Sequence, residues 1–204
     1  MTKKINTVIF DIGGVLVDYH QEEYYRRRGY APETAARLAA VTMRSSWWDE
    51  YDRGLLSDEE IRGCFKKNAP ELAEEIDASL THMAGIVTKR ETAIPWIRSV
   101  KARGCRALVL SNFSHTAYED CREDAMQFLD ETDGGILSFR EHVIKPEPLI
   151  YELLLGRYAI DPARAVFIDD TQKNLTGAER FGIRTIHYRS QEQAESELDA
   201  LLGR

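Results

Sequence analysis

The chain has 204 residues, of which 43% are hydrophobic and 30% are charged. This composition is typical of a folded protein of one to one and a half domains, at roughly 150 residues per domain, and it excludes a disordered or fibrous chain. With 27 Lys and Arg against 34 Asp and Glu, the formal net charge is -7, which disfavours a broad nucleic-acid- or membrane-binding surface. An anionic substrate would therefore need a local cluster of positive charge or a bound cation.

The cysteines and the N-terminal segment predict a cytoplasmic protein. The three cysteines are odd in number, far apart and without a CxxC pair: Cys64, Cys105 and Cys121. This pattern argues against a disulfide scaffold or a cysteine zinc site and fits a reducing compartment. The apolar run Ile5–Phe10 is too short for a secretory signal, and no uncharged apolar stretch approaches the length of a membrane span.

Short apolar runs alternate with helical patterns along most of the chain. The runs that predict strands are Thr7–Phe10, Ala107–Leu110, Ala165–Ile168 and Arg184–His187. The patterns that predict helices are Ala93–Arg103, Thr116–Phe128, Pro148–Tyr158, Asn174–Phe181 and Gln191–Leu202. Continuous apolar runs suit strands that are buried on both faces of a parallel sheet. The alternation therefore predicts an α/β fold with a doubly wound parallel sheet.

Residues 19–92 differ from the rest, because they contain no convincing strand and show several helical patterns. Pro32 and Pro70 suit the first turn of a helix. Ser57 and Glu60 form a capping box at the start of another helix. We expect an inserted helical cap at 19–92, riding on a core formed by 1–18 and 93–204.

Reactive side chains follow the predicted strands. Parallel sheets bind ligands beyond the carboxyl ends of their strands, so these residues are expected to converge there. They are Asp11 after the first strand, Ser111 and Asn112 after the second, Asp169 and Asp170 after the third, and Lys145 at the start of the helix before the third.

These residue types together suit phosphoryl transfer. Carboxylates from separate strands can hold Mg²⁺, which prefers oxygen ligands and commonly bridges to a phosphate. Asp11, kept ionised by the metal and by Lys145, is a plausible nucleophile. The Ser111 hydroxyl and loop amides would bind phosphate oxygens, and the lysine would neutralise charge. Each residue alone also has an ordinary explanation as a turn, cap or surface residue, so the prediction depends on their order along the chain.

In this order, the residues resemble the four motifs of the haloacid-dehalogenase-like superfamily. The matching positions are Asp11 to Val15, Ser111, Lys145, and Asp169-Asp170 with Asn174. The resemblance covers essentially the whole chain, and residues 19–92 look like the superfamily's α-helical cap. Phe10–Asp18 and Lys145–Pro148 look most like the bacterial α-glucose-1-phosphate phosphatase group. The phosphatase domain of soluble epoxide hydrolase is similar but more distant.

The resemblance implies a Rossmann-like core and a magnesium-dependent phosphatase of a small phosphorylated metabolite. It implies an aspartyl-phosphate intermediate on Asp11. Phosphate would be bound by Ser111, Asn112 and Lys145. The metal site would comprise Asp11, the Gly13 carbonyl, Asp169 and Asp170, with Asp170 the direct ligand and Asp169 its supporting partner.

Gly13 departs from the superfamily pattern. Phosphatases of the superfamily usually have a second Asp two positions after the nucleophile, which protonates the leaving group and then activates water. General acid–base catalysis is typically worth about 10²–10⁴-fold, so we expect a slower enzyme or one that favours good leaving groups. Asp18, His20 or a water could replace the missing group, and the glucose-1-phosphate phosphatase group also has glycine there.

Two other functions compete with the phosphatase. The metal-independent 2-haloacid dehalogenases also lack the second Asp, but adjacent Asp169 and Asp170 invite a cation and favour a phosphatase. A non-catalytic or regulatory phosphate-binding protein is the alternative from a different class. Gly13 favours it, whereas four intact motif residues count against it: Asp11, Ser111, Lys145 and Asp170.

The cap segment Trp47–Gly54 bears on specificity. In related capped proteins the equivalent segment contacts substrate, and Arg53 is the candidate for that contact because a guanidinium suits phosphate or sugar oxygens. The alternative places Arg53 on the surface, and at least one of the two tryptophans is expected in the cap core. Among the five histidines, His115 is expected near the site.

Overall fold

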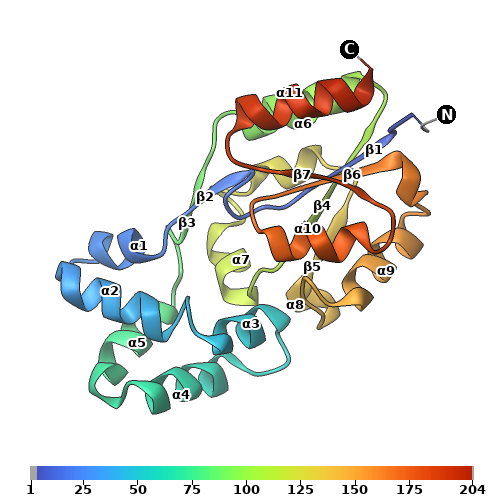
Figure 1. The fold of residues 1–204 in the computed structure, drawn as a ribbon. Coiled ribbons are helices and arrows are strands. Elements are labelled where there is room, and N and C mark those ends of the chain that lie inside the picture. Colours follow the sequence, from blue (N-terminus) through green and yellow to red (C-terminus); the bar gives the residue numbers. More distant parts are fainter. Residues whose placement is uncertain (1–3, 204) are drawn as a thin grey trace.

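The computed structural model describes residues 4–203 and contains a five-stranded parallel sheet with helices on both faces (Figure 1). The strand order is β5-β4-β1-β6-β7. The strands are β1 (Thr7–Phe10), β4 (Arg106–Ser111), β5 (Gly135–Leu137), β6 (Ala165–Asp169) and β7 (Arg184–His187). The α/β class and the Rossmann-like parallel sheet predicted from the apolar runs are confirmed.

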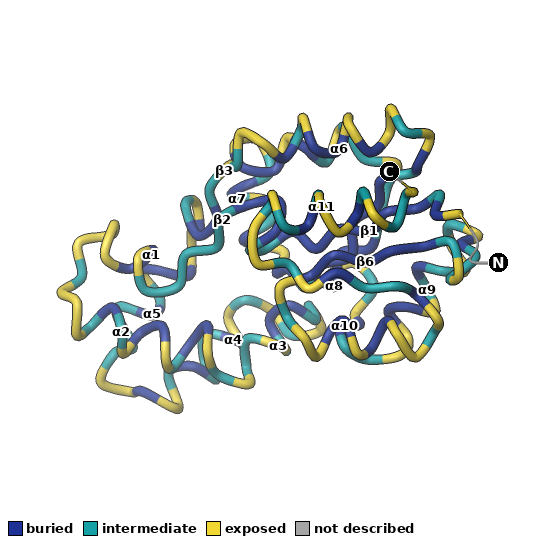
Figure 2. Tube along the Cα trace, turned by 45° about the horizontal axis from the view of Figure 1, so that its top comes forward, coloured by how far each residue is buried: buried dark blue, intermediate teal, exposed yellow. Residues whose placement is uncertain are grey.

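Residues of the central strand β1 alternate between two apolar layers. Val8 and Phe10 are buried with residues of helices α6 (Ala93–Ala102) and α11 (Gln191–Leu202), whereas Ile9 is buried with α9 (Pro148–Arg157) and α10 (Gln172–Glu179). Figure 1 shows α6 and α11 on one side of the sheet and α9 and α10 on the other. Burial on both faces explains why these strands are apolar at every position, and Figure 2 shows the central strands buried.

A helical unit lies apart from the sheet and is joined to it by a two-stranded antiparallel ribbon (Figures 1 and 2). The ribbon consists of β2 (Val17–Tyr19) and β3 (Val87–Lys89), with Val17 opposite Lys89. Between them lie α1 (Glu22–Arg27), α2 (Pro32–Val41), α3 (Ser46–Arg53), α4 (Asp58–Asn68), the 3₁₀ turn η1 (Pro70–Leu72) and α5 (Ala73–Leu80). We propose that this ribbon divides core from cap, near the expected boundaries at 18–19 and 92–93.

Three expectations about secondary structure were wrong. Residues 19–92 do contain a strand, β3, which is only three residues long and pairs with β2 alone. The strand β5 was also missed, because three residues give too little periodicity. The helix expected over 116–128 ends early: α7 (His115–Cys121) is followed by turns, which bury Met126, and by the 3₁₀ segment η2 (Gln127–Glu131), which buries Phe128.

The predicted helix starts agree with the structure. Pro32 opens α2, and Pro70 opens the short η1 turn. At the start of α4, the Glu60 amide donates to Ser57 Oγ at 3.3 Å and the Ser57 amide donates to Glu60 Oε2 at 2.9 Å, which confirms the capping box. The short helix α8 (Ser138–Glu141) and the 3₁₀ turn η3 (Pro162–Arg164) complete the elements.

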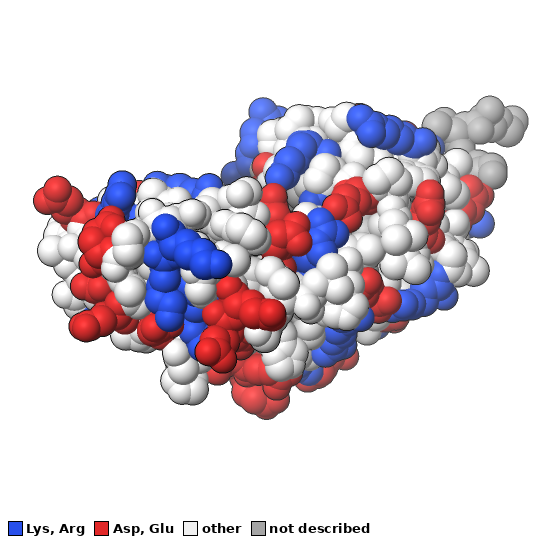
Figure 3. Space-filling model, turned by 90° about the horizontal axis from the view of Figure 1, so that it is seen from below, with Lys and Arg blue, Asp and Glu red and all other residues white. Residues whose placement is uncertain are grey.

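The surface carries both signs of charge. On the face in Figure 3, Lys and Arg side chains are interspersed with Asp and Glu. Over residues 4–203, no helix combines the length and apolar character needed to cross a membrane. Cys64, Cys105 and Cys121 are all free thiols.

Candidate active site

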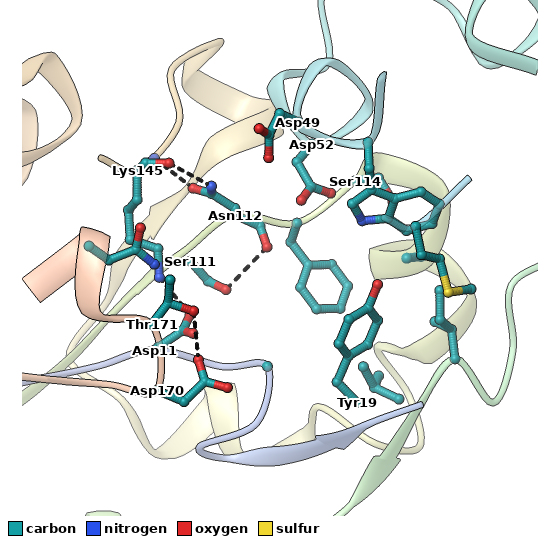
Figure 4. Close-up of a pocket in the computed structure, with 18 of the residues that line it drawn as sticks. Asp11, Tyr19, Asp49, Asp52, Ser111, Asn112, Ser114, Lys145, Asp170 and Thr171 are labelled. Atoms are coloured by element: carbon teal, nitrogen blue, oxygen red, sulfur yellow. Dashed lines mark hydrogen bonds and ion pairs between the residues drawn. The ribbon is translucent and has the colours of Figure 1, made fainter. Parts of the chain in front are cut away.

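The carboxyl ends of β1, β4 and β6 open into a cavity of about 410 Å³ between the sheet and the cap. The core contributes Asp11, Ser111, Lys145 and Asp170 to its lining. Asp11 and Asp170 follow β1 and β6, Ser111 ends β4, and Lys145 lies between α8 and α9. The fold brings all four to one edge of the sheet, as their places along the chain predicted. Figure 4 shows them on one side of the cavity.

Lys145 is the electrostatic centre of the core side. Its side chain is 2% exposed, and Nζ lies 2.8 Å from Asp11 Oδ1 and 2.7 Å from Asp169 Oδ2. Although burial alone would lower the pKa of this ammonium, the two carboxylates raise the pKa of Lys145 above its ordinary value. Lys145 therefore stays charged, and it holds Asp11 in a defined position.

Asp169 is held entirely by the protein. Its side chain is fully buried, and besides Lys145 it accepts hydrogen bonds from the Thr171 amide at 2.7 Å and from Asn174 Nδ2 at 3.1 Å to both oxygens. With its oxygens occupied in this way, Asp169 orients Lys145 and the loop after β6. Asp11 and Asp170 are left to face the cavity.

Asp11, Asp169 and Asp170 offer carboxylate oxygens that lie within 4.8 Å of one another. Burial and the neighbouring Asp169 and Asp170 charges raise the pKa of Asp11 to about 7, against the opposing effect of Lys145. Burial and Asp169 also raise the pKa of Asp170. Crowded carboxylates with raised pKa values gain from a nearby cation, and hard oxygen donors are the ligands that Mg²⁺ prefers. The residues present therefore fit a divalent metal.

Glycines shape the loop after β1. Gly14 has φ +76°, and a Cβ placed on it would lie 2.4 Å from Asp170 Oδ2. Only a glycine lets Asp170 approach the loop this closely. Gly13 lines the cavity, and a Cβ placed there meets no heavy atom within 4 Å. The position where the superfamily pattern has its second Asp is therefore open space beside Asp11.

Ser111 and Asn112 occupy different surroundings at the end of β4. Ser111 is 1% exposed and lines the cavity; its hydroxyl donates only a long bond, of 3.4 Å, to the Asn112 carbonyl. The Asn112 side chain clamps Lys145 instead: Nδ2 donates to the Lys145 carbonyl at 3.0 Å, and Oδ1 accepts from the Lys145 amide at 2.7 Å. Asn112 also lines the cavity, but its side-chain hydrogen bonds position the main chain of Lys145.

The cap contributes the opposite wall of the cavity. The ribbon, α3 and the connecting segments supply Tyr19, Met43, Trp48, Asp49, Asp52, Ile86 and Val87. Trp48 also packs on Phe65 and Tyr51 at ring-centroid distances of 6.1 and 5.5 Å, so one tryptophan does join the cap core. Asp52 and Tyr19 were not singled out from the sequence. Trp48 and Asp52 are four residues apart on α3 and share one helical face, which is the pattern that could have indicated them.

The structure places Arg53 and His115 outside this cavity lining. Arg53 lies between core and cap, where NH1 and NH2 donate to the Glu147 carboxylate at 2.8 and 2.7 Å and Nε donates to Glu50 at 3.1 Å. His115 is exposed and lines a separate hollow beside Tyr51 and Phe139. The sheet thus brings together Asp11, Ser111, Lys145 and Asp170, while Arg53 binds a core carboxylate.

The parallel sheet has a Rossmann-like arrangement, with a buried lysine and three carboxylates gathered at the carboxyl ends of its strands. The family model for haloacid dehalogenase-like hydrolases matches residues 5–182. The chain belongs to this family.

Two curated relatives have different lengths. The sesquiterpene phosphatase astK of Aspergillus oryzae is 22% identical over 206 residues, and the match covers 100% of both proteins. Acyl-CoA dehydrogenase family member 10 of Mus musculus is 28% identical over 211 residues. That match covers 98% of this chain, which spans only 19% of the mouse protein.

Solved structures share the fold. A HAD family enzyme of Bacteroides thetaiotaomicron, in complex with magnesium and inorganic phosphate, has a TM-score of 0.70 and 20% identity over 92% of this chain and 96% of that one. The L-2-haloacid dehalogenase of Xanthobacter autotrophicus has a TM-score of 0.64 and 20% identity over 96% and 83%. At these identities the similarity establishes the fold alone.

Proposed function

We propose that the protein is a magnesium-dependent phosphatase of a small phosphorylated metabolite, with Asp11 as the nucleophile. One observation carries the proposal: Lys145 bridges Asp11 and Asp169 while Asp170 lies within the same carboxylate cluster. The arrangement favours a cation and an anionic phosphoryl group together. It leaves Asp11 accessible to a substrate in the cavity.

In this proposal each residue has a distinct part. Asp11 attacks phosphorus, while Ser111 and Lys145 bind the phosphoryl oxygens. Asp11, Asp170 and the Gly13 carbonyl are the metal ligands, and Asp169 orients Lys145. Bound there, Mg²⁺ would supply positive charge beside the phosphoryl oxygens. The magnesium and phosphate complex of the Bacteroides enzyme supports this choice.

The lining of the cavity supports a proposal for the substrate class. About 410 Å³ admits a metabolite-sized molecule, and its cap side combines apolar Met43 and Trp48 with polar Asp52 and Tyr19. A phosphorylated alcohol with both apolar and hydroxyl-bearing surface, such as a sugar phosphate, fits these walls. The free thiols of all three cysteines fit a cytoplasmic enzyme.

A haloacid dehalogenase is the second candidate, because its fold is shared. The packed cluster of Asp11, Asp169 and Asp170 weighs against it, since three crowded carboxylates repel an anionic haloacid unless a cation is bound. A regulatory protein that binds phosphate without turnover is the third.

The decisive assay is hydrolysis of p-nitrophenyl phosphate with and without Mg²⁺, using Asp11→Asn as the control. Release that requires Mg²⁺ and disappears in Asp11→Asn is expected. If folded protein that binds Mg²⁺ releases no more nitrophenol than Asp11→Asn does, the proposed enzymatic function is wrong. Halide release from 2-haloacids without metal would support the dehalogenase, and labelling of Asp11 without turnover would support the regulatory protein.

A further inference from the structure

The cavity wall opposite Asp11 contains an acid that the family motifs do not include. Asp52 lies in the last turn of α3, and its residue is 8% exposed. Figure 4 shows its carboxylate pointing into the cavity from the cap side, across from Asp11 and Asp170. Among residues 4–203, no hydrogen-bond donor reaches this carboxylate, whereas the main-chain carbonyl of Asp52 accepts a hydrogen bond from Ser138 Oγ. A buried carboxyl group without a protein partner is available to a ligand.

Asp52 is fixed to the core although it belongs to the cap. Ser138 Oγ donates to the Asp52 carbonyl at 2.5 Å and accepts from the Phe113 amide at 2.8 Å. The next residue, Arg53, binds Glu147 through two hydrogen bonds. Gly54 lies so close to Phe139 that a Cβ on it would be 3.0 Å from the Phe139 main chain. Anchors on both sides therefore hold Asp52 beside the loop that follows Ser111.

The other replacements for the acid missing at Gly13 are engaged elsewhere. Asp18 accepts from Arg90 Nε at 2.7 Å, and His20 Nε2 lies 2.8 Å from Thr88 Oγ1. Neither residue lines the cavity, whereas Asp52 does. The space beside Gly13 is open, and a substrate phosphate ester that Asp11 attacks can direct its leaving oxygen toward Asp52 across the cavity.

We propose that Asp52 is the general acid and base of this phosphatase, supplied by the cap in place of a carboxylate at position 13. The inference rests on the proposed phosphatase function. As Asp11 attacks phosphorus, the bond from phosphorus to the leaving oxygen breaks, and that oxygen takes the proton of the Asp52 carboxyl. The Asp52 carboxylate then removes a proton from water, whose oxygen attacks phosphorus and releases phosphate and the Asp11 carboxylate.

The charges around Asp52 suit this cycle. Burial and the negative charges of Asp49 and Asp11 raise the pKa of Asp52 well above that of an exposed carboxyl, and Lys145 opposes them. The buried Tyr19 hydroxyl, which also lines the cavity and has no partner within the described chain, faces the same space (Figure 4). A protonated carboxyl and a hydroxyl directed at the leaving group are consistent with recognition of an alcohol oxygen.

The test compares two esters of similar shape, p-nitrophenyl phosphate and p-methylphenyl phosphate, in single-turnover kinetics with Mg²⁺. The nitrophenolate leaves without a proton, whereas the methylphenolate gains from one. In Asp52→Asn, the phosphorylation rate with p-methylphenyl phosphate is expected to fall about 10²-fold or more, and at least about tenfold further than the rate with p-nitrophenyl phosphate. Glu59→Gln removes one negative charge from an exposed position of α4 outside the cavity lining and should leave the ratio of the two rates as in the wild type.

A double variant adds a rescue. Gly13→Asp places a carboxylate in the open space beside Asp11. In the Asp52→Asn background, it should return the ratio of the phosphorylation rates with the two esters toward the wild-type value. Equal losses with both esters in Asp52→Asn, or no loss with either, would overturn the role of Asp52 while leaving the phosphatase intact. A wild-type protein that hydrolyses neither ester would refute the phosphatase itself, together with this inference.

Discussion

Arg53 and Glu147 join the cap to the core. The guanidinium of Arg53, at the end of α3, donates two hydrogen bonds of 2.8 and 2.7 Å to the carboxylate of Glu147, the residue that directly precedes α9. Arg53 also lowers the pKa of Glu147, so the pair is ionised at neutral pH. Glu147 comes two residues after Lys145, so the pair fixes α3 beside Lys145.

This pair predicts the same phenotype for two variants. Arg53→Ala and Glu147→Ala should each raise KM for p-nitrophenyl phosphate by a similar factor, because either change frees the last turn of α3. The KM of the double variant should be little higher than that of either single variant, because the two residues act through one contact. If Arg53→Ala alone impairs binding while Glu147→Ala has no effect, Arg53 contacts substrate directly, as the sequence suggested.

Gly14 predicts a loss of metal affinity without the loss of a ligand. In Gly14→Ala the new methyl group would displace Asp170, whose Oδ2 lies 2.4 Å from the Cβ position, and the residue would be strained at φ +76°. We expect Mg²⁺ affinity, measured by titration calorimetry, to fall about tenfold or more. Gly13→Ala is the matched control, because nothing lies within 4 Å of its Cβ position. Equal affinities in the two variants would refute this account.

Lys145 predicts a large effect on stability. Lys145→Met leaves the buried Asp11 and Asp169 without their cation, and the loss of one partner of a buried ion pair typically costs about 3–5 kcal/mol. Urea unfolding in metal-free buffer should show a free energy of unfolding lower by this amount. Lys173→Met, at an exposed position lining the same cavity, should change it by no more than about 0.5 kcal/mol. A loss below about 1 kcal/mol in Lys145→Met would contradict the ion-pair geometry.

Asp52 predicts a stability that depends on pH. Because the pKa of Asp52 is raised in the folded protein, ionisation favours the unfolded chain: the penalty is absent below the unfolded pKa of about 3.9 and grows as pH rises toward the folded pKa. Asp52→Asn should therefore raise Tm at pH 7 in metal-free buffer. The expected rise is at least about 2–4 °C, the shift that 1 kcal/mol produces in a chain of this size.

As a control, the wild type and Asp52→Asn are compared below pH 4, where their Tm values should become equal. Asp49→Asn, at an exposed position on the same helix, should give a smaller rise at pH 7. A lower Tm for Asp52→Asn than for the wild type at pH 7 would show that the Asp52 carboxylate is stabilised in the folded protein.

The long apolar strands and their end residues could be predicted from the sequence. β1, β4 and β6 are apolar because both faces of the sheet are covered, so each gives a continuous run that ends at a reactive residue. The ribbon strands β2 and β3 and the edge strand β5 have three residues each. Such short strands form because a neighbouring strand is present to pair with them, and three residues are too few to show a periodicity that predicts a strand.

The core side of the site could likewise be predicted from the sequence, whereas its cap side could not. Asp11, Lys145 and Asp170 follow from local order along the chain, because parallel strands must end at one edge of the sheet. Asp52 and Tyr19 reach the cavity only because the cap docks on the core through contacts such as Ser138 with the Asp52 carbonyl, 86 residues apart. No local pattern specifies a contact of that separation. The sequence by itself therefore determined the chemistry at the sheet edge, and the tertiary structure decided which cap residues face it.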